Sequence, residues 1–332
     1  MTVRIGTRAS KLALTQTQQT ADRLAAVGGF DVELVHVRTD GDVLTGSLSQ
    51  MGGTGVFVAA LRDALLRNEC DVAVHSLKDL PTGSAPGLTL AATPPRVDVR
   101  DVLCARDGLK LADLPKGARV GTGSPRRAAQ LRAVRPDLDI VDIRGNVDTR
   151  LGRVPGLPGN ATDAVVDGKS CDLDAVVLAA AGLERIGRLD TVTEYLETDI
   201  MLPAAGQGSL AIECRTAEAP RRAGSTEGSQ GVLAQALAAL DDADTRLAVT
   251  AERALLARLE AGCAAPVGAY AYRKGSMLHL EAVVCAVDGT ASVRDKRATD
   301  GLTEVGATLL GIELAEVLLA AGAADIADLT AS

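Results

Sequence analysis

Apolar and polar positions in the first hundred residues follow two kinds of pattern in turn. Short apolar or alternating runs predict strands over residues 3–7, 31–37 and 70–76. Longer runs between them predict helices over residues 11–26 and 56–69. Because strands and helices alternate, we expect βαβ units and a mainly parallel sheet with helices on both faces.

The same alternation starts again near residue 100 and predicts a second domain of this kind. Its elements are expected to be strands over residues 100–106, 118–124 and 138–145, a helix over 125–134, and a buried strand that runs into a helix over 173–187. The Pro/Gly-rich run over 153–163 reads as an exposed loop. The polar, Gly-rich run over 39–55 is long for a compact domain and is either a functional lid or disordered.

Past residue 217 the pattern changes. A polar, Gly-rich run over 218–231 is interpreted as a linker. It precedes a helix over 244–261, two alternating strands over 268–273 and 277–287, and a final helix over 303–320. These elements predict a small α+β third domain, and a chain of 332 residues is long enough for all three domains.

Composition excludes several classes of function. The net charge is −8, aromatic residues make up 2% of the chain, and Trp is absent; neither polyanion attraction nor base stacking is favoured, so we expect no nucleic-acid partner. The six cysteines are scattered without a CxxC pair, which argues against a disulfide framework and against a metal site. With no signal segment and no membrane-length apolar run, we expect a cytoplasmic protein without a membrane partner.

Two short stretches share a device at the start of a helix. "IGTRAS" (5–10) and "VGTGSP" (120–125) each join a strand to a helix through Gly-Thr and a capping serine, Ser10 or Ser124. Pro125 suits the first helical position. Each copy alone is best explained as a cap. Two copies in two similar domains suggest two anion sites that face each other, because helix N-termini bind carboxylate and phosphate.

Arginine is concentrated around the second copy. The chain has 28 Arg and 7 Lys, which we attribute to codon bias, but eight of the arginines fall between Arg119 and Arg153 with four aspartates and no lysine. A solvated helix face explains Arg132 and Arg135. It explains Arg126 and Arg127 less well, because positive charge in the first helical turn opposes the helix dipole. Guanidinium groups bind carboxylate and phosphate bidentately, so we expect a small ligand with several such groups.

"VHSLKDLP" (74–81) places a carboxylate, Asp79, directly after a buried strand. In open α/β sheets ligands bind at the carboxyl ends of strands, so Asp79 is either a general acid/base and cation stabiliser or a turn residue. Cys263 in "ARLEAGCAAPVG" (257–268) stands alone in a small-residue loop past a helix. A buried free cysteine is the commoner explanation. A nucleophile that reacts in every catalytic cycle is disfavoured, because a helix C-terminus raises the pKa of a nearby thiol.

Taken together, these stretches resemble the porphobilinogen deaminase (hydroxymethylbilane synthase) family. The resemblance covers nearly the whole chain, in order and spacing, through eight stretches: "RIGTRASKLAL", "HSLKDLP", "GTGSPRRAAQL", "DIRGNVDTRL", "AGLERIG", "LPAAGQG", "AIECR" and "TAERALLARLEAGCAAPVG". It implies a transferase that joins porphobilinogen units head to tail, with release of ammonia, to give hydroxymethylbilane in tetrapyrrole (haem-type) biosynthesis. The primer implied is a dipyrromethane cofactor, made from two substrate units and linked to a cysteine by a thioether.

The resemblance also assigns roles to residues. It implies that Cys263 carries the dipyrromethane and that Asp79 is the catalytic carboxylate, which contacts pyrrole N–H groups and stabilises the cation left when the amino group departs. Arginines at matching positions would bind the acetate and propionate groups: Arg8, Arg126, Arg127, Arg144, Arg150 and Arg185. Further matching contacts to cofactor and substrate would come from Ser10, Gln16, Phe57, Ser76, Lys78, Thr122, Ser124, Gly145 and Gln207.

The implied fold is α/β, with two periplasmic-binding-protein-like domains with mainly parallel sheets plus a small α+β C-terminal domain. Domain 1 would comprise residues 1–96 and about 205–222, domain 2 residues 97–204, and domain 3 residues 228–332, and we expect a monomer. The chain departs from the family pattern at Asp40, Gln50 and Thr54, where basic residues are common, and in the longer 153–163 run. The alternative hypothesis is a non-catalytic binding module for a small polycarboxylate or polyanion.

Overall fold

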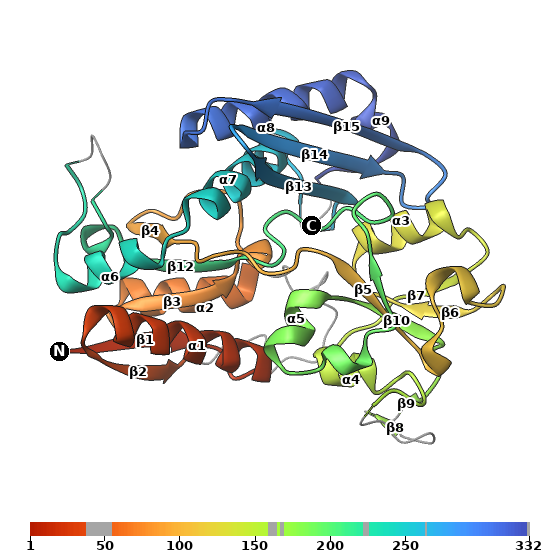
Figure 1. Cartoon of the computed structure of the whole chain (residues 1–332), viewed down its shortest axis with the longest axis horizontal. Coiled ribbons are helices and arrows are strands. Elements are labelled where there is room, and N and C mark those ends of the chain that lie inside the picture. Colours follow the sequence, from red (N-terminus) through yellow and green to blue (C-terminus); the bar gives the residue numbers. More distant parts are fainter. Residues whose placement is uncertain (38–54, 159–164, 167–168, 222–225, 263, 331–332) are drawn as a thin grey trace.

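The computed structural model describes residues 1–37, 55–158, 165–166, 169–221, 226–262 and 264–330, with the backbone alone for residues 55–57, 165–166 and 169–170. Two five-stranded sheets lie side by side, and a three-stranded sheet with its helices lies across them (Figure 1). In the part of the chain that is described, no helix is long and apolar enough to cross a membrane.

The first sheet has the strand order β2-β1-β3-β12-β4. Its strands are β1 (Thr2–Thr7), β2 (Asp31–His36), β3 (Val72–Ser76), β4 (Leu88–Ala92) and β12 (Leu210–Arg215). Four strands run in one direction, and β12 runs against them. One face is covered by α1 (Lys11–Gly28) and α6 (Val232–Leu240), and the other by α2 (Gly55–Leu66).

The second sheet has the order β11-β5-β10-β6-β7. Its strands are β5 (Asp101–Ala105), β6 (Arg119–Gly121), β7 (Asp139–Val141), β10 (Ala175–Ala179) and β11 (Glu194–Leu196). Only β5 runs against the others among these five. Helix α3 (Pro125–Val134) packs on one face, and α4 (Val147–Leu151) and α5 (Ala180–Arg185) pack on the other. A small ribbon of β8 (Val165–Val166) and β9 (Lys169–Ser170) forms a separate sheet.

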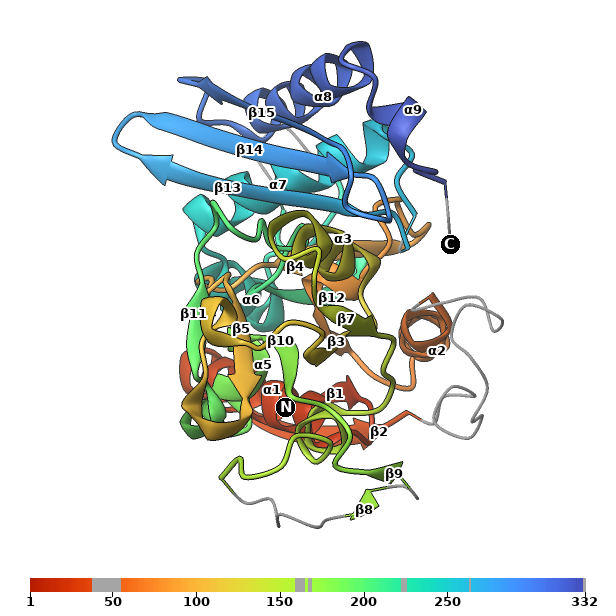
Figure 2. The same ribbon diagram turned by 90° about the vertical axis from the view of Figure 1, so that its right-hand side faces the viewer.

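The third sheet is an antiparallel meander of β13 (Val267–Lys274), β14 (Met277–Cys285) and β15 (Ser292–Thr299). Helices α7 (Ala243–Arg258) and α8 (Glu304–Ala320) cover one face around a core of small and branched side chains, and the short α9 (Ala323–Ile326) follows. Figure 2 shows this sheet above the rest of the chain, with α3 directly beneath it. Four buried side chains fill that joint: Ala129 of α3, Leu202, and Val283 and Cys285 of β14.

The predicted fold class is confirmed: two α/β sheets with four of five strands in one direction, and a small α+β unit. The predicted helix over 125–134 has the observed bounds, and most other predicted elements differ from the observed ones by a few residues. The strand predicted over 118–124 ends at Gly121, and that over 138–145 ends at Val141. The predicted loop over 39–55 lies, except for Gly55, outside the described residues.

Among the α-helices and strands of the described residues, eight were missed, namely β4, β8, β9, β11, β15, α4, α6 and α9. The clearest case is β15, an edge strand that carries Arg294, Asp295, Lys296 and Arg297 in succession. Its outward and half-buried positions alternate, but charged side chains occupy both, so no apolar period marks the strand. Charge on an edge strand is a usual protection against pairing with a second sheet, which explains why the pattern departs from that of a central strand.

Two segments cross between the first and second sheets. Residues 93–100 lead from β4 to β5, and residues 197–209 lead from β11 back to β12. Where they pass each other, the Val97 N–H donates to the Gly208 carbonyl at 3.3 Å. This close approach requires glycine: Gly208 has φ +86°, and a Cβ there would lie 2.7 Å from the Val97 oxygen.

One fully buried carboxylate, Glu252 of α7, joins both crossing segments to the third domain. Its oxygens accept from the Arg96 guanidinium at 2.6 and 3.1 Å. They also accept from the backbone N–H groups of Gly206 (2.6 Å) and Ala271 (2.7 Å). All four donors are therefore held by one side chain, and the third domain fixes the path of both crossings.

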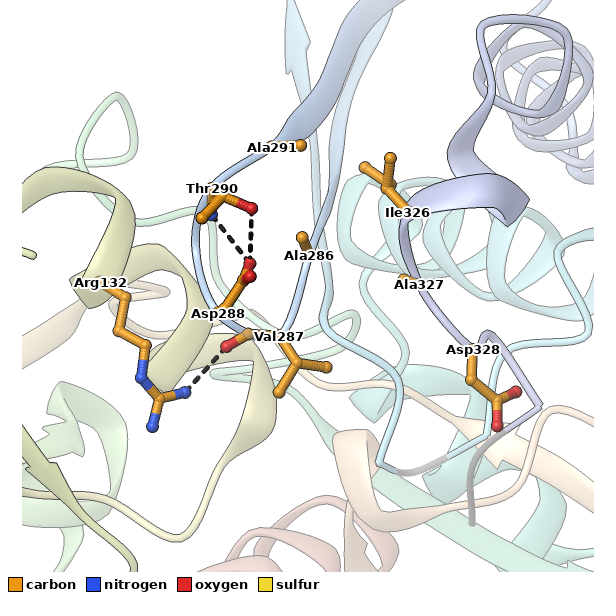
Figure 3. A pocket seen from close by; sticks show the side chains of 9 residues that line it. All are labelled: Arg132, Ala286, Val287, Asp288, Thr290, Ala291, Ile326, Ala327 and Asp328. Carbon is orange, nitrogen blue, oxygen red and sulfur yellow. Dashed lines mark hydrogen bonds between the residues drawn. The ribbon is translucent and has the colours of Figure 1, made fainter.

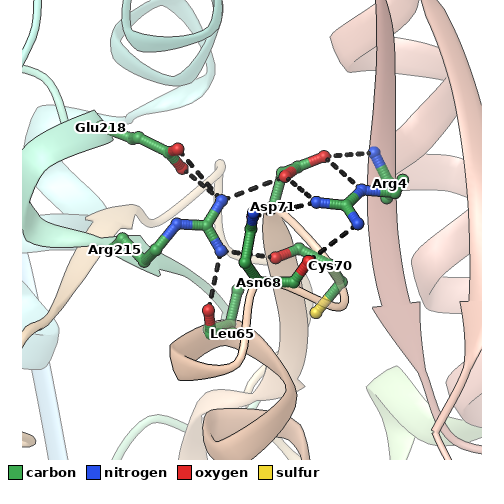
Figure 4. Close-up of polar contacts among 7 residues, drawn as sticks. All are labelled: Arg4, Leu65, Asn68, Cys70, Asp71, Arg215 and Glu218. Atoms are coloured by element: carbon green, nitrogen blue, oxygen red, sulfur yellow. Dashed lines mark hydrogen bonds and ion pairs between the residues drawn. The ribbon is translucent and has the colours of Figure 1, made fainter.

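A second charged cluster ties the strands together at the far edge of the first sheet (Figure 4). Asp71, just before β3, accepts from the Arg4 guanidinium of β1 (2.8 Å) and from Arg215 at the end of β12 (3.0 Å). Arg215 also pairs with Glu218 at 2.8 Å. Since β1 and β3 begin at this edge, their carboxyl ends, where Arg8 and Asp79 follow, lie at the opposite edge.

Replacement of Gly208 by alanine should destabilise the crossing. The left-handed backbone costs about 1–2 kcal/mol for alanine, and the contact with Val97 adds a further cost of about 1–3 kcal/mol. Gly187→Ala is the matched control, because Gly187 also has positive φ but a Cβ there meets nothing within 4 Å. Thermal denaturation should show a clearly larger loss for Gly208→Ala. Equal losses in the two variants would show that the close approach is not a constraint.

Candidate active site

Polar residues of the first domain gather at the carboxyl edge of its sheet. Because β1 and β3 are parallel neighbours, Arg8 and Ser10 after β1 lie near Ser76, Lys78 and Asp79 after β3. Lys78 and Asp79 belong to a single 3-10 turn over Leu77–Asp79. The buried Gln16 of α1 hydrogen-bonds the Ser76 hydroxyl at 3.2 Å, which brings two more predicted site residues together.

The second sheet presents a corresponding edge. Thr122 and Ser124 follow β6, while Arg144 and Gly145 follow its parallel neighbour β7. The Ser124 hydroxyl caps α3 by accepting from the Arg127 N–H, and Ser10 caps α1 by accepting from the Ala13 N–H. Both predicted caps are confirmed.

Gly145 meets a steric requirement in this second edge. Its φ is +106°, and a Cβ there would lie 2.7 Å from Thr149. Its carbonyl oxygen accepts from the Arg150 guanidinium at 2.8 Å. Absence of a side chain at Gly145 thus permits the turn that sets Arg150 in place.

The two arginines at the start of α3 share one buried carboxylate, Asp101 of β5. Arg126 and Arg127 each place a guanidinium nitrogen 2.8 Å from a different oxygen of Asp101, whose side chain is 0% exposed. The Arg126 contact is a close ion pair without an aligned hydrogen bond, whereas Arg127 donates at 2.9 Å. Burial alone would raise the pKa of Asp101, but Arg126 and Arg127 outweigh it and lower the pKa to about 2.

Asp101 also binds Gln207 of the returning crossing. The Gln207 side-chain amide donates to Asp101 at 2.9 Å and to the Val99 carbonyl at 2.8 Å. Its own oxygen is buried and has no hydrogen-bond partner among the described residues. One residue further on, the Gly208 carbonyl accepts from Arg185 at 2.9 Å, and burial lowers the pKa of Arg185 to about 10. Of these two predicted site residues, Gln207 lies in the returning crossing segment, and Arg185 of α5 binds that segment.

The edges of the two domains meet at Lys78, Asp79 and Arg150. Burial, and then the charge of Arg127, lower the pKa of Lys78 to about 8, while Asp79 opposes them. Lys78 has many protein atoms around it, but its side chain is still exposed to solvent. Burial and the charges of Arg127 and Arg144 lower the pKa of Arg150 to about 10, and Asp79 again opposes the shift. Groups from both sheets thus share one electrostatic environment.

The Asp79 carboxylate stands among these cations without a protein partner. Within the described part of the chain, no side chain or backbone group donates a hydrogen bond to it or forms an ion pair with it. Its neighbours in charge are Lys78 and Arg150. Arg144, by contrast, has a weak, exposed pairing with Asp142 at 3.4 Å. This edge combines a carboxylate free to accept hydrogen bonds with cations that a negatively charged ligand can approach.

Several predicted residues are not placed by the structure. Cys263, Asp40, Gln50 and Thr54 lie outside the described residues. The backbone of Phe57 belongs to the first turn of α2. Among the residues that are described, no group of three or more potential ligands could hold a metal ion.

Four charged residues near the site were missed in the sequence: Asp101, Glu213, Arg62 and Arg253. Glu213 of β12 is buried and accepts from Arg62 of α2 at 2.8 and 3.0 Å; His75 lies 3.2 Å away, a structural pairing. Asp101 stands in a strand whose other residues are apolar, "DVLCA", and Glu213 stands among apolar residues in "LAIECR", where the only other charge is Arg215 at the end of the strand. A lone charge in a buried strand requires a partner, and that signal could have identified both.

A hollow of about 860 Å³ opens elsewhere, at the joint of the second and third domains. Figure 3 shows Arg132 of α3 on one side, the turn of Asp288 and Thr290 between β14 and β15, and Ile326 and Asp328 on the other side. None of the predicted site residues that the structure describes lines it. It is separate from the edge that carries Asp79.

Two α/β domains whose strand ends meet, with Lys78 and Arg150 beside a carboxylate that has no partner among the described residues, form a site suited to a small anionic ligand. Family models match most of the chain: "Porphobilinogen deaminase, dipyromethane cofactor binding domain" over residues 3–222 and "Porphobilinogen deaminase, C-terminal domain" over residues 246–320. The chain belongs to the porphobilinogen deaminase family.

Two porphobilinogen deaminases that are similar over nearly their whole length agree with this assignment. Porphobilinogen deaminase of Cutibacterium acnes is 55% identical, with 99% of this chain and 98% of that protein covered. That of Mycobacterium tuberculosis is 48% identical, with 98% of each covered. Among solved structures, a periplasmic substrate-binding protein of an ABC transporter from Coxiella burnetii covers 72% of this chain and 91% of its own, at 13% identity and a TM-score of 0.41.

These matches confirm the predicted family, the enzymatic activity and the cofactor. The chain is a transferase that polymerises porphobilinogen in tetrapyrrole biosynthesis and uses dipyrromethane. The alternative of a non-catalytic binding module is therefore set aside. The roles of individual site residues and the domain boundaries stay predictions.

Asp101→Asn should destabilise the fold strongly. It leaves two adjacent buried guanidinium groups without a counter-charge, at a cost of about 3–5 kcal/mol. Asp139→Asn is the control, since Asp139 forms an exposed pair with Arg119 at 3.4 Å, and such pairs contribute about 0–1 kcal/mol. Urea denaturation at pH 7 measures both; a loss for Asp101→Asn no larger than the control's would contradict the central role of Asp101.

The same pairing predicts how stability depends on pH. The pKa of Asp101 is about 2 in the folded chain and 3.8 ordinarily, so the unfolded chain takes up the proton first as the pH falls. Stability from this carboxylate is therefore complete above about pH 5 and is lost as the pH falls from about 4 to 2. Denaturation midpoints across this range should fall less steeply in Asp101→Asn than in the parent chain; parallel curves would rule out the linkage.

Proposed function

We propose that polymerisation takes place where the carboxyl edges of the two sheets meet, with Asp79 as the catalytic carboxylate. The observation that carries this proposal is the position of Asp79 among Lys78 and Arg150 with no described protein partner of its own. A carboxylate that already served a structural ion pair, as Asp101 does, would not be available to a substrate. Asp79 is available, and it adjoins cations that can hold the substrate's carboxylates.

The reaction requires Asp79 to stabilise a positive charge that develops on the pyrrole. Porphobilinogen loses its amino group as ammonia, and the pyrrole left behind carries positive charge. A carboxylate that accepts a hydrogen bond from the pyrrole N–H stabilises this charge as it develops, and one fixed by the protein needs no reorganisation. Lys78, whose pKa is about 8, stays largely protonated near pH 7 and keeps the site cationic around Asp79.

The arginines divide into two groups by their contacts. Arg126 and Arg127 are buried and share Asp101, so they supply one net positive charge within a rigid ion pair. Arg144 follows β7 of the second sheet, and Arg150 lies in the next helix, α4, where it donates to the Gly145 carbonyl. We propose that the second group, with Arg8 and Arg185, binds the acetate and propionate groups of substrate and growing chain. Arg126 and Arg127, which are also predicted to bind these groups, would do so through the one net positive charge that their pair with Asp101 leaves.

The donor set suits the dipyrromethane cofactor. Its carboxylates require cations and its pyrrole N–H groups require acceptors, and this edge offers both, including the unpartnered oxygen of the buried Gln207. When bound through Cys263, the cofactor supplies the nucleophilic pyrrole end that is extended. Ser10, Gln16, Phe57, Ser76, Thr122 and Ser124 would complete its surroundings.

The organisation proposed for the chain follows the same assignments. Domain 1 comprises residues 1–96 and about 205–222, domain 2 residues 97–204, and domain 3 residues 228–332. The two crossing segments, and β12 between β3 and β4, support the discontinuous first domain. We further propose that the enzyme works as a cytoplasmic monomer without a nucleic-acid partner. Size-exclusion chromatography with light scattering would test the oligomeric state.

Intact-mass spectrometry tests the tether. The purified enzyme should weigh more than its chain by two linked pyrrole units, and Cys263→Ala should lack that increment. Cys285→Ala is the control, because Cys285 is buried between α3 and β14 and should leave the increment in place. A parent mass equal to that of the bare sequence, or an increment that survives Cys263→Ala, would refute the assignment of Cys263.

Replacement of Asp79 tests the catalytic role. Asp79→Ala removes a partly exposed side chain that has no partner among the described residues. It should therefore retain the fold and the cofactor increment and yet lose nearly all turnover, at least about 100-fold for a lost charge-stabilising group. Product formation, intact mass and melting temperature are measured together. Near-normal turnover with the cofactor in place would reassign the carboxylate.

A further inference from the structure

An arginine of the third domain, Arg253, hydrogen-bonds the backbone directly after Asp79. Arg253 of α7 donates to the carbonyl oxygens of Leu80 at 2.9 Å and Pro81 at 2.6 Å. These carbonyls follow Asp79 by one and two residues in irregular backbone, and in the described structure Arg253 is their hydrogen-bond donor. The planar fork of a guanidinium suits two successive carbonyls, which an ammonium cannot match in geometry.

The same helix face supplies an apolar contact to this turn. Val249, one helical turn before Arg253, packs with Leu77 and Leu80 in a small buried cluster. The remaining members of that cluster are Val58 of α2 and Ala211 of β12. Leu77 and Leu80 lie on either side of Asp79 in the chain. Helix α7 therefore contacts this turn twice: Val249 packs against its buried leucines, and Arg253 binds the Leu80 and Pro81 carbonyls.

The position of α7 is itself fixed by the residue next to Arg253. Glu252 binds Arg96 and the Gly206 N–H of the crossing segments. Gly206 in turn packs against the backbone N of Lys78, where a Cβ would lie at 3.2 Å. Two consecutive residues of one helix therefore bind the crossing segments and the Asp79 turn, and a shift of either would move the other.

Structural demand alone does not account for this use of Arg253. Its side chain is largely surrounded by protein, and burial lowers its pKa. Placing a guanidinium there costs desolvation free energy that a neutral amide or an apolar residue would not incur. What the guanidinium adds is a fixed geometry for two carbonyls beside the reacting carboxylate.

We propose that Arg253 is a positioning residue that fixes the Asp79 turn from the third domain. This inference rests on the proposed function, because it assigns Arg253 an effect that acts through Asp79. It predicts that loss of the fork leaves substrate binding intact and misplaces the carboxylate during reaction. Misplacement of a catalytic group by about 1 Å can cost about 100-fold in rate.

The test combines single variants with a double-mutant cycle on the cofactor-loaded enzyme, confirmed by intact mass. Arg253→Met should keep KM within about twofold and lower kcat about 10- to 100-fold. Arg253→Lys should recover part of kcat. Arg258→Met is the matched control: Arg258 lies five residues further along α7 in an exposed pair with Glu316, and its loss should leave kcat unchanged.

The cycle separates positioning from a general loss of stability. If Arg253 acts through Asp79, then Asp79→Asn/Arg253→Met should have the residual single-turnover rate of Asp79→Asn, within about twofold. Losses that multiply, an unchanged kcat in Arg253→Met, or a raised KM with normal kcat would each overturn the positioning role. Should Arg253→Met fail to fold, Arg253→Lys carries the same cycle.

The outcome also distinguishes the two proposals. If Asp79→Asn retains normal turnover, the catalytic assignment of Asp79 fails and the positioning role fails with it. If Asp79→Asn is inactive while Arg253→Met and Arg253→Lys match the parent enzyme, only the positioning role is overturned.

Discussion

The interaction on which the rest of the site depends is the buried pairing of Asp101 with Arg126 and Arg127. A carboxylate with no exposed surface is stable only when its charge is compensated, and here two guanidinium groups and an amide do so. The pairing resolves a conflict in the sequence, since two arginines in the first turn of α3 oppose the helix dipole. The Asp101 carboxylate, from a neighbouring strand, compensates one of the two positive charges, and the other remains for the site.

Asp101 also connects the chemistry to the crossing segments. Gln207, in one crossing segment, donates to Asp101 and to the carbonyl of Val99 in the other. The two segments are so close that a Cβ on Gly208 would lie 2.7 Å from the Val97 oxygen. Glu252 then ties both crossings to α7. Charges that are expensive to bury are concentrated where the two α/β domains and the third domain meet. Separation of those domains would break these ion pairs and hydrogen bonds.

The sequence was informative wherever a residue's role follows from its immediate neighbours. Ser10 and Ser124 were predicted as caps because Gly-Thr and a helical run surround them, and Asp79 was singled out because a buried strand ends just before it. The βαβ alternation predicted parallel strands, and β1 beside β3 and β6 beside β7 are indeed parallel. Family resemblance supplied what local pattern lacks, namely the cofactor and the roles of distant residues.

Sequence reasoning failed where the partner of a residue is remote in the chain. Asp101 meets Arg126 and Gln207 across 25 and 106 residues, and Arg253 meets Leu80 across 173. No local period encodes such contacts, although the isolated charges in β5 and β12 signal that a partner must exist. The residues that orient the site were therefore harder to find than those that form its edge. Their effect is nonetheless decisive, because a carboxylate stabilises a developing charge only when the surrounding backbone holds it in place before the reaction begins.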